Sequence, residues 1–483
     1  MSRLNSNRRQ FTKAALASMA TIAIGGTKSS AKVLGANEKV RVALAGLNGR
    51  GAAHLEEYLR MKNVEIAWLV DPDSRTWTRR ITQVAKNQAN PPKTTKDVRK
   101  ALEDKNVDVV SIATPNHWHS LMTIWACQAG KDVYVEKPCS QVLNEGRIAV
   151  EVARKTNRIV QHGTQGRAMD SWSQLAEIVK SGRYGKLLVS RALCYKLRPS
   201  IGIRADKPAP SEVDFDIWNG PAPKHSYNEN LVHYNWHWFW DFGNGDIGNQ
   251  GVHQMDVARW LIPGATLPVS VFSVGGRVGY KDQGQTPNTQ VGWLDFGPDK
   301  AKLIFEVRGF PSDKYRGEAI GNILHFEQGV VAGGKFFAKG EGKGEPLPKV
   351  DAPKKGLGGG IFGNFIEAVR TRKREMLDAE ILEGHYSSAC CHLVNVSYRL
   401  GQKAEFDSKS DKLPGGAALQ ETIGRMGAHL KARGIELDGA TNIYHLGKQL
   451  AFDPKSEICP GDNDANALLS RPSREGYAIP EKV

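Results

Sequence analysis

The lysine of the tripeptide Glu136-Lys137-Pro138 is the residue of this sequence whose position most favours chemistry. It follows residues 132–135, an apolar stretch typical of a short buried strand. In open parallel sheets, ligands bind outside the carboxyl ends of the strands, so Lys137 is predicted to face a ligand. A lysine there can hydrogen-bond a substrate hydroxyl group and lower the pKa of that group. Most lysines are solvated surface charges, and only its position distinguishes Lys137. A cis bond at Pro138 would aim its side chain.

A second candidate for proton transfer lies in residues 249–260. If this segment is one helix, Asn249 and His253 share a face, because residues four apart are neighbours on a helix. A histidine can accept the proton that a substrate hydroxyl group loses. Taken alone, the segment is better interpreted as a helix whose polar residues cap it and face solvent. Together with Lys137 and a nucleotide-binding pattern, it is interpreted as catalytic.

That nucleotide-binding pattern begins at residue 40, where an apolar strand leads into a glycine-rich turn and a helix. In the GxGxxG fingerprint Asn48 stands at the usual place of the second glycine, and asparagine tolerates a positive φ better than most residues. The turn residues expected to contact a pyrophosphate are Gly46, Asn48, Gly49, Arg50 and Gly51.

A glycine pattern alone is weak, since ordinary strand-to-helix turns resemble it. Asp71 strengthens it, because this acid ends a second apolar stretch about 20 residues after the last glycine, where a ribose-binding acid belongs. A carboxylate there hydrogen-bonds a free 2′-hydroxyl group and repels a 2′-phosphate. The sequence therefore predicts NAD as the cofactor rather than NADP.

Polar residues at two further strand ends are expected to contact the same cofactor. Thr114, Asn116 and His119 follow the predicted strand 107–113, and Glu136 precedes Lys137. For His119, a capping or packing role is the simpler interpretation. His117 and His119 are two residues apart with no third ligand nearby, so no metal site is predicted.

Residues 234–240 are unusually aromatic. Aromatic faces suit the apolar faces of sugar rings, whose hydroxyl groups need polar partners. Asn235, His237 and Trp238 are therefore candidates for substrate binding. A core contact or a subunit contact explains the same aromatic residues equally well.

The order of predicted elements indicates an α/β Rossmann domain followed by an α+β domain with a large, mainly antiparallel open sheet. Residues 330–338 are predicted to be one strand of that second sheet, and the proline-rich residues 198–224 an ordered loop. We divide the chain into a leader (1–36), an NAD-binding domain (37–160), a substrate and oligomerisation domain (161–406) and a C-terminal extension (407–483).

The leader has the form of a twin-arginine export signal, with Arg8 and Arg9 followed by the apolar residues 14–26. This apolar stretch is too short for a stable membrane span. A basic tail or a simple signal anchor is the alternative. The expectation is export to the periplasm by the twin-arginine machinery, with no membrane span after cleavage.

The net charge of +15 does not indicate nucleic-acid binding, because part of it lies in the leader and no basic cluster is interleaved with aromatic residues. The basic residues that precede the first acid, Glu38, are Arg3, Arg8, Arg9, Lys13, Lys28 and Lys32. The six cysteines lack metal-site or disulfide spacing and are expected to be small buried residues.

With these motifs, the chain resembles the Gfo/Idh/MocA oxidoreductases, the family of glucose-fructose oxidoreductase and inositol dehydrogenase, from Val40 to about Phe406. The resemblance implies that Lys137 and His253 act on a substrate carbonyl or hydroxyl group. Family members often carry aspartate at the position of Asn249, and asparagine cannot stabilise an imidazolium by charge. By the same resemblance, Gln165 lies near the nicotinamide and Arg167 near the substrate. A homodimer or homotetramer, formed through an exposed sheet face, is expected as in relatives.

These features predict an exported oxidoreductase that transfers hydride between NAD and a secondary hydroxyl group of a sugar or glycoside. A compartment without a nicotinamide pool requires that the cofactor stay bound and be regenerated in place. Oxidation of one sugar with reduction of another satisfies this requirement. Redox-neutral cleavage of a glycoside, by oxidation, elimination and reduction, satisfies it too. A non-catalytic sugar-binding protein is the remaining alternative.

Overall fold

The computed structural model describes residues 39–340 and 342–480. The predicted twin-arginine leader lies outside these residues. Within them, the first domain contains a six-stranded sheet of order β3-β2-β1-β4-β5-β6, in which every neighbouring pair is parallel. Its strands are β1 (Val40–Ala45), β2 (Val64–Val70), β3 (Lys93–Thr95), β4 (Val109–Ile112), β5 (Asp132–Val135) and β6 (Val160–His162).

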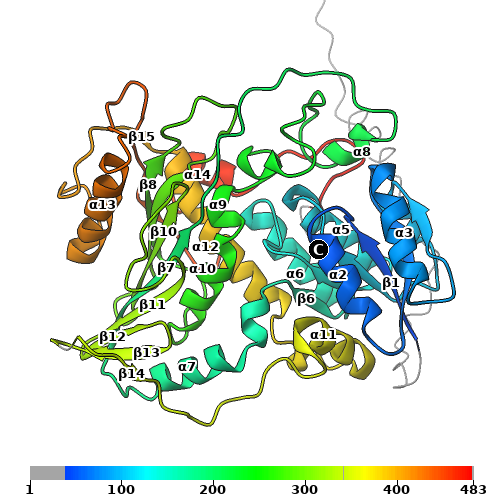
Figure 1. Cartoon of the computed structure of the whole chain (residues 1–483), viewed down its shortest axis with the longest axis horizontal. Coiled ribbons are helices and arrows are strands. Elements are labelled where there is room, and N and C mark those ends of the chain that lie inside the picture. The colour runs from blue at the N-terminus through cyan, green and yellow to red at the C-terminus, as the bar shows by residue number, and fades with distance from the viewer. Residues whose placement is uncertain (1–38, 341, 481–483) are drawn as a thin grey trace, which may run out of the picture. The chain divides into compact units, whose positions relative to one another are not determined.

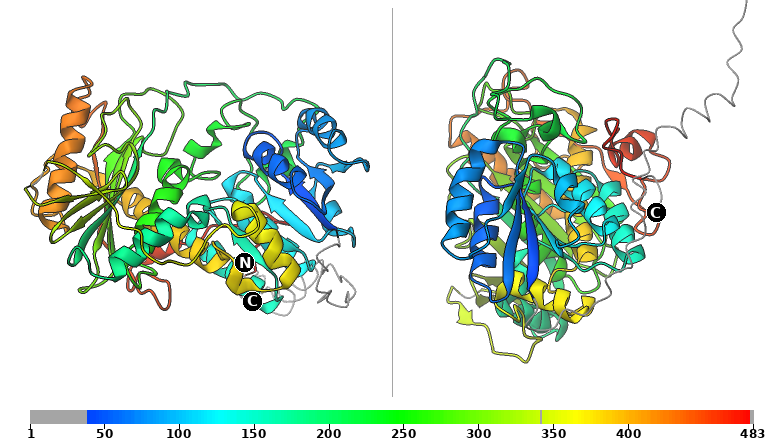
Figure 2. Two further views of the ribbon diagram at one scale, coloured as in Figure 1. Left: turned by 60° about the horizontal axis from the view of Figure 1, so that its bottom comes forward. Right: turned by 90° about the vertical axis from the view of Figure 1, so that its right-hand side faces the viewer.

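Helices cover both faces of this sheet, because its central strands are apolar on both sides. Helices α2 and α3 lie over one face, and α5 and α6 over the other (Figure 2). The helices of this part are α2 (Arg50–Leu59), α3 (Trp77–Ala85), α4 (Val98–Leu102), α5 (His119–Gln128) and α6 (Leu143–Lys155). The prediction of a doubly wound parallel sheet is confirmed.

The second sheet is mainly antiparallel, although β7 and β10 pair in parallel at its centre. Its longer strands are β7 (Leu187–Tyr195), β8 (Ser270–Gly276), β9 (Thr289–Asp295), β10 (Lys302–Arg308), β11 (Ile320–Phe326), β12 (Gly329–Ala332) and β13 (Lys335–Ala338). Two-residue strands extend it: β14 (Glu345–Pro346), β15 (Gln402–Lys403), β16 (His445–Leu446) and β17 (Leu450–Ala451).

The single strand predicted for residues 330–338 was wrong. Gly333 and Gly334 both have positive φ, at 55° and 72°, and form a tight turn that divides the segment into β12 and β13. Two successive positive φ values suit a hairpin turn, which the apolar pattern of the segment concealed.

Helices on one face of the second sheet build the main core. Phe305 of β10 packs there with Met255 of α10 (Gly251–Trp260) and Leu393 of α12 (Ile381–Arg399). In Figure 1, α12 runs between the two domains. The other helices of the second part are α7 (Asp170–Lys180), α8 (Phe215–Asn219), α9 (Gly245–Gly248), α11 (Gly360–Thr371), α13 (Gly416–Lys431) and α14 (Asn463–Leu468).

The opposite face of the second sheet is covered over β8, β9 and β10, where we expected an exposed sheet face. Helix α13 lies on this side (Figures 1 and 2). Its Ile423 and Met426 are buried with Trp293 of β9 and Ile304 of β10.

Late segments of the chain also return to the first domain. Phe362 of α11 stacks on Tyr134 of β5, with ring centroids 4.3 Å apart. Near the C-terminus, Tyr477 packs edge to face against Trp118, with centroids 5.5 Å apart. The two domains are therefore not strictly consecutive in sequence, because α11 and the C-terminal residues pack on the first domain.

Candidate functional site

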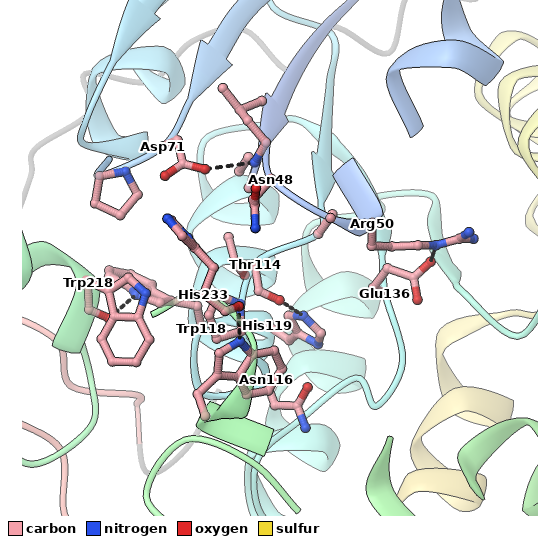
Figure 3. Close-up of a pocket in the computed structure, with 18 of the residues that line it drawn as sticks. Asn48, Arg50, Asp71, Thr114, Asn116, Trp118, His119, Glu136, Trp218 and His233 are labelled. Carbon is pink, nitrogen blue, oxygen red and sulfur yellow. Dashed lines mark hydrogen bonds and ion pairs between the residues drawn. The ribbon is translucent and has the colours of Figure 1, made fainter. Parts of the chain in front are cut away.

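A cavity of about 310 Å³ lies along the carboxyl edge of the first sheet. Figure 3 shows residues that line it. Most of the predicted contact residues line this cavity: Gly46, Asn48, Gly49, Arg50, Asp71, Thr114, Asn116, His119, Glu136, Lys137, His237 and Asn249.

The glycine-rich turn is built for close approach of backbone. Gly46 has φ of +85°, and a β-carbon there would lie 2.5 Å from the carbonyl oxygen of Ala113. A β-carbon on Gly51 would lie 1.8 Å from the carbonyl oxygen of Gly46. Helix α2 begins at Arg50, and no side chain caps its N-terminus. Its first amide groups are therefore placed as in an anion site.

Asp71 joins the turn to the end of β2. The backbone N–H groups of Leu47 and Asp73 donate to its two carboxylate oxygens, at 2.8 and 2.9 Å. Burial raises the pKa of Asp71 to about 6. Each oxygen can accept a further hydrogen bond, and Asp71 lines the cavity, as binding of a ribose hydroxyl group requires.

At the end of β4, the hydroxyl oxygen of Thr114 is buried in the cavity wall and has no hydrogen-bond partner among the described residues. A buried hydroxyl group without a partner is costly, so this atom is suited to a ligand. The cradle formed by the turn, Asp71 and Thr114 thus fits a dinucleotide.

His119 joins the loops that follow β4 and β5. Its ring nitrogens lie 2.6 Å from the carbonyl oxygen of Pro138 and 2.8 Å from that of Thr114. The peptide bond between Lys137 and Pro138 is cis. Both loops are therefore fixed next to Lys137.

Glu136 is the anchor of the loop after β5. Its carboxylate accepts hydrogen bonds from Arg50 Nε at 2.7 Å and Gln165 Nε2 at 3.3 Å, and lies 3.2 Å from His54 Nε2. These partners hold the pKa of Glu136 well below its usual value despite burial, which acts in the opposite direction. Figure 3 shows the pair with Arg50.

The ammonium group of Lys137 lies 3.5 Å from Asn249 Oδ1. Burial lowers the pKa of Lys137, and the carboxylate of Glu136 opposes that effect. Burial and the charge of Lys137 lower the pKa of His253 to about 3. His253 is therefore neutral at physiological pH.

Asn249 and His253 do not share one helix, which corrects our prediction. Helix α9 ends at Gly248 and α10 begins at Gly251, and Asn249 between them has φ −101° and ψ −96°. Gly251, the first residue of α10, lies close to β10. A β-carbon there would lie 2.8 Å from Phe305 Cζ.

Some predicted contact residues do not line the cavity. Gly51 lies behind the turn, and Gln165 contacts Tyr134 and Glu136. The guanidinium of Arg167 is buried against Asp256, at 2.9 Å, and also binds Glu383. The remaining residues outside the lining are Asn235, Trp238 and His253.

Residues 212–238, which we term the strap, form a wall of the cavity, of which the sequence predicted only His237. The strap contributes Ile217, Trp218, His233, Tyr234, Trp236 and His237 to the lining. His233 Nε2 lies 2.8 Å from Asp73 Oδ2, two residues after Asp71. The indole N–H of Trp118 donates to the carbonyl oxygen of Trp218 at 3.2 Å. These pairs join residues about 100 or more apart in sequence, so no local pattern reveals them.

The C-terminal residues hold the strap from outside. Arg474 Nη1 donates to Asp216 Oδ1 at 2.8 Å, and Arg471 Nη2 donates to the carbonyl oxygen of His117 at 2.8 Å. In Figure 1 this red segment runs near α8 of the strap. The first domain and the strap thus line most of the cavity, and the C-terminal residues hold the two together.

Comparison with protein families identifies both domains. Residues 40–164 match the model of the GFO_IDH_MocA oxidoreductase family, NAD-binding Rossmann fold. Residues 194–282 match the model of the C-terminal alpha/beta domain of the same oxidoreductase family. The prediction of an NAD-binding Rossmann domain is confirmed.

Curated relatives match over part of their length. The chain is 29% identical over 160 residues to a glycosyl hydrolase family 109 protein of Shewanella sp. (strain W3-18-1), covering 32% of this chain and 34% of the relative. It is 28% identical over 162 residues to an alpha-N-acetylgalactosaminidase of Shewanella oneidensis, covering 32% and 35%. The match thus spans about a third of the length of these relatives.

A solved structure shares the fold. The WlbA dehydrogenase of Bordetella pertussis, in complex with NADH and UDP-GlcNAcA, has a TM-score of 0.55 at 16% identity. The similarity covers 74% of this chain and 97% of that enzyme.

No helix within residues 39–340 and 342–480 is long and apolar enough to cross a membrane.

Proposed function

Because two stretches of this chain match the models of the two Gfo/Idh/MocA oxidoreductase domains, we propose that it is an NAD-dependent oxidoreductase acting on a secondary hydroxyl group, or the corresponding ketone, of a sugar or glycoside. One observation carries the proposal. Lys137 lines the same cavity as the glycine-rich turn and Asp71, so a proton donor stands beside a dinucleotide cradle. When bound, the nicotinamide supplies the acceptor or donor of hydride.

The residues that hold the dinucleotide are those of the cradle. The backbone of Gly46 to Arg50 and the N-terminus of α2 bind the pyrophosphate, and Asp71 binds a ribose. The hydroxyl group of Thr114 gains its missing partner. The carboxylate of Asp71 disfavours a 2′-phosphate, in agreement with NAD.

Lys137 donates a hydrogen bond to the reacting oxygen, and Asn249 orients its ammonium group. His253, which stays neutral next to this positive charge, accepts the hydroxyl proton. Of the predicted substrate contacts, His237 supplies the cavity wall next to Lys137.

The strap supports a cofactor that stays bound. It crosses the cradle and is tied to the first domain at its first residues and at His233. Release of a dinucleotide requires these ties to break. Export through the twin-arginine pathway, which the leader sequence favours, also requires a cofactor that stays bound, since the periplasm offers no nicotinamide pool.

A redox-neutral glycosidase is the second candidate. The matches to the family 109 glycosyl hydrolase and to the alpha-N-acetylgalactosaminidase favour it. Oxidation, elimination of the aglycone and reduction then return the cofactor to its starting state, which suits an enclosed cradle.

The experiment is to purify the mature protein, denature it and measure released nicotinamide by absorbance. About one dinucleotide per chain supports a resident cofactor, and an empty protein that turns over only with added NAD contradicts it. A panel of glycosides, assayed for ketone formation and aglycone release, separates the two chemistries. Turnover unchanged by both Lys137→Ala and His253→Ala removes the catalytic assignment of these two residues. Sugar binding by the unaltered protein without any turnover favours a sugar-binding protein.

We further propose a periplasmic homo-oligomer. Replacing Arg8 and Arg9 by lysine is expected to abolish export, and cell fractionation measures this. Light scattering of the mature protein tests for a dimer or tetramer. A monomer at all concentrations contradicts it.

A further inference from the structure

Two lysines from different domains each contact one of two consecutive amide side chains. Lys137 follows β5, and its Nζ lies 3.5 Å from Asn249 Oδ1. Lys196 follows β7, and its Nζ donates to Gln250 Oε1 at 3.2 Å. Asn249 and Gln250 are consecutive residues between α9 and α10. Both acceptors are uncharged, so neither lysine is neutralised by this contact.

The carboxylates nearby are already paired. Arg50 binds Glu136, with 2.7 Å between Nε and Oε1. Arg198 binds Asp246 with two hydrogen bonds, at 2.9 and 2.7 Å. Within the described residues, Lys137 and Lys196 form no ion pair. The cationic side chains Lys137, Lys196, Arg50 and Arg198 thus share the two carboxylates of Glu136 and Asp246 in a partly buried region, so a net positive charge remains.

The surroundings reinforce this positive potential. Helix α10 directs its N-terminus at the same point, since it begins one residue after Gln250 and no side chain caps it. The charge of Lys196 also contributes to the lowered pKa of Lys137, which places the two ammonium groups in one electrostatic environment. Such a region is stabilised by a bound anion.

We propose that Lys196 forms a carboxylate subsite, and that the substrate is a sugar acid such as a hexuronic acid. This assignment rests on the proposed function, which gives the orientation of the substrate in the site. Lys137 stays with the reacting oxygen, and Lys196 binds the carboxylate. A carboxylate fits better than a phosphate, because one free ammonium group is offered and the guanidinium groups of Arg50 and Arg198 are occupied.

The test compares glucuronate with glucose, and galacturonate with galactose, as probes titrated into the purified NAD-loaded protein by calorimetry. We expect the uronates to bind about tenfold more tightly than the hexoses, with a preference that falls as salt rises. Lys196→Met should weaken uronate binding about tenfold and leave hexose binding within about twofold. Lys196→Gln repeats the test with a polar side chain.

Lys431→Met, at an exposed site on α13, is the matched control and should change neither affinity. Equal affinity for uronate and hexose overturns the proposal, as does an equal loss of both in Lys196→Met. Tighter binding of glucose 6-phosphate than of glucuronate overturns the choice of a carboxylate. Uronate binding without oxidation or cleavage contradicts the proposed function and leaves the subsite standing, so the two failures are distinguishable.

Discussion

Glu136 sets the electrostatics of the site at the scale of single residues. Side chains of Arg50, His54 and Gln165 converge on its carboxylate, and the next residue is Lys137. A buried carboxylate that faces this many donors is restricted to one orientation. The contacts of Glu136 therefore hold in place the loop that carries Lys137.

Lys137→Met is expected to reduce kcat by about 10²- to 10⁴-fold, the range typical of a lost general acid–base group. The nicotinamide content of the purified protein should stay near that of the unaltered chain, because the cradle is untouched. Absorbance after denaturation measures the content, and steady-state assays measure kcat. A loss of cofactor equal to the loss of activity would instead give Lys137 a role in binding.

Glu136→Gln is expected to shift the alkaline limb of the pH–rate profile to lower pH. The carboxylate raises the pKa of Lys137, so its removal lets the ammonium group lose its proton at lower pH. Glu375→Gln, at an exposed site, serves as the control. An unchanged limb would mean that another group titrates there.

Sequence reasoning found residues that follow strands and missed residues that arrive by long-range packing. Asp71, Thr114 and Lys137 come directly after apolar strands, so their place at the sheet edge follows from topology. His233 lies in the second domain, and its contact with Asp73, 160 residues away in sequence, has no local signal. Arg167 was expected near the substrate, but its pairing with Asp256 depends on a helix 89 residues later.

At the scale of elements, the strap and the C-terminal segment act as one closure. Their ties include the pair Arg474–Asp216, in which the Asp216 side chain is 59% exposed. An exposed ion pair contributes at most about 1 kcal/mol. A small, measurable effect on cofactor release is therefore expected from this pair.

Arg474→Ala is expected to speed release of the dinucleotide by about two- to fivefold, as loss of up to about 1 kcal/mol implies. Asp216→Ala should have the same effect, and the double variant should add nothing more, because both changes break one contact. Retention of nicotinamide during repeated gel filtration measures the rate. Additive effects would show that the two residues act separately.

Element boundaries were predicted well where apolar periodicity and glycine agree. β1 was predicted to the residue, whereas β3 was missed because three residues carry no periodic signal. The break before α10 was missed as well. The irregular backbone lies at Asn249, and the polar pattern of residues 249–256 does not reveal it.

At the scale of the whole molecule, buried histidines control the response to acid. Burial lowers the pKa of His117, His237 and His392 to about 3, and that of His162 to about 4. The unfolded chain binds protons at these residues near pH 6.5, and the folded chain does not. Stability from these groups is complete above pH 6.5 and is lost as the pH falls toward 3.

We therefore expect the free energy of unfolding to fall between pH 6.5 and 4 by about 1 kcal/mol per pH unit for each such histidine. Asp71, whose raised pKa is about 6, acts in the opposite direction over part of this range. Denaturant unfolding at a series of pH values measures the slope. His392→Asn, which is distant from the cavity lining, should reduce it. A flat profile would contradict the neutrality of these groups.

Helix α13 should keep its part of the second sheet covered when the protein is diluted. A layer contributed by another subunit dissociates when the protein is diluted, whereas α13 is tethered to the sheet by the chain itself. Tethering through a short linker gives an effective concentration in the millimolar range, whatever the amount of protein in solution. The apolar side chains around Trp293 should thus stay covered at nanomolar concentration. Any self-association must use another surface, and its loss on dilution should leave this core intact.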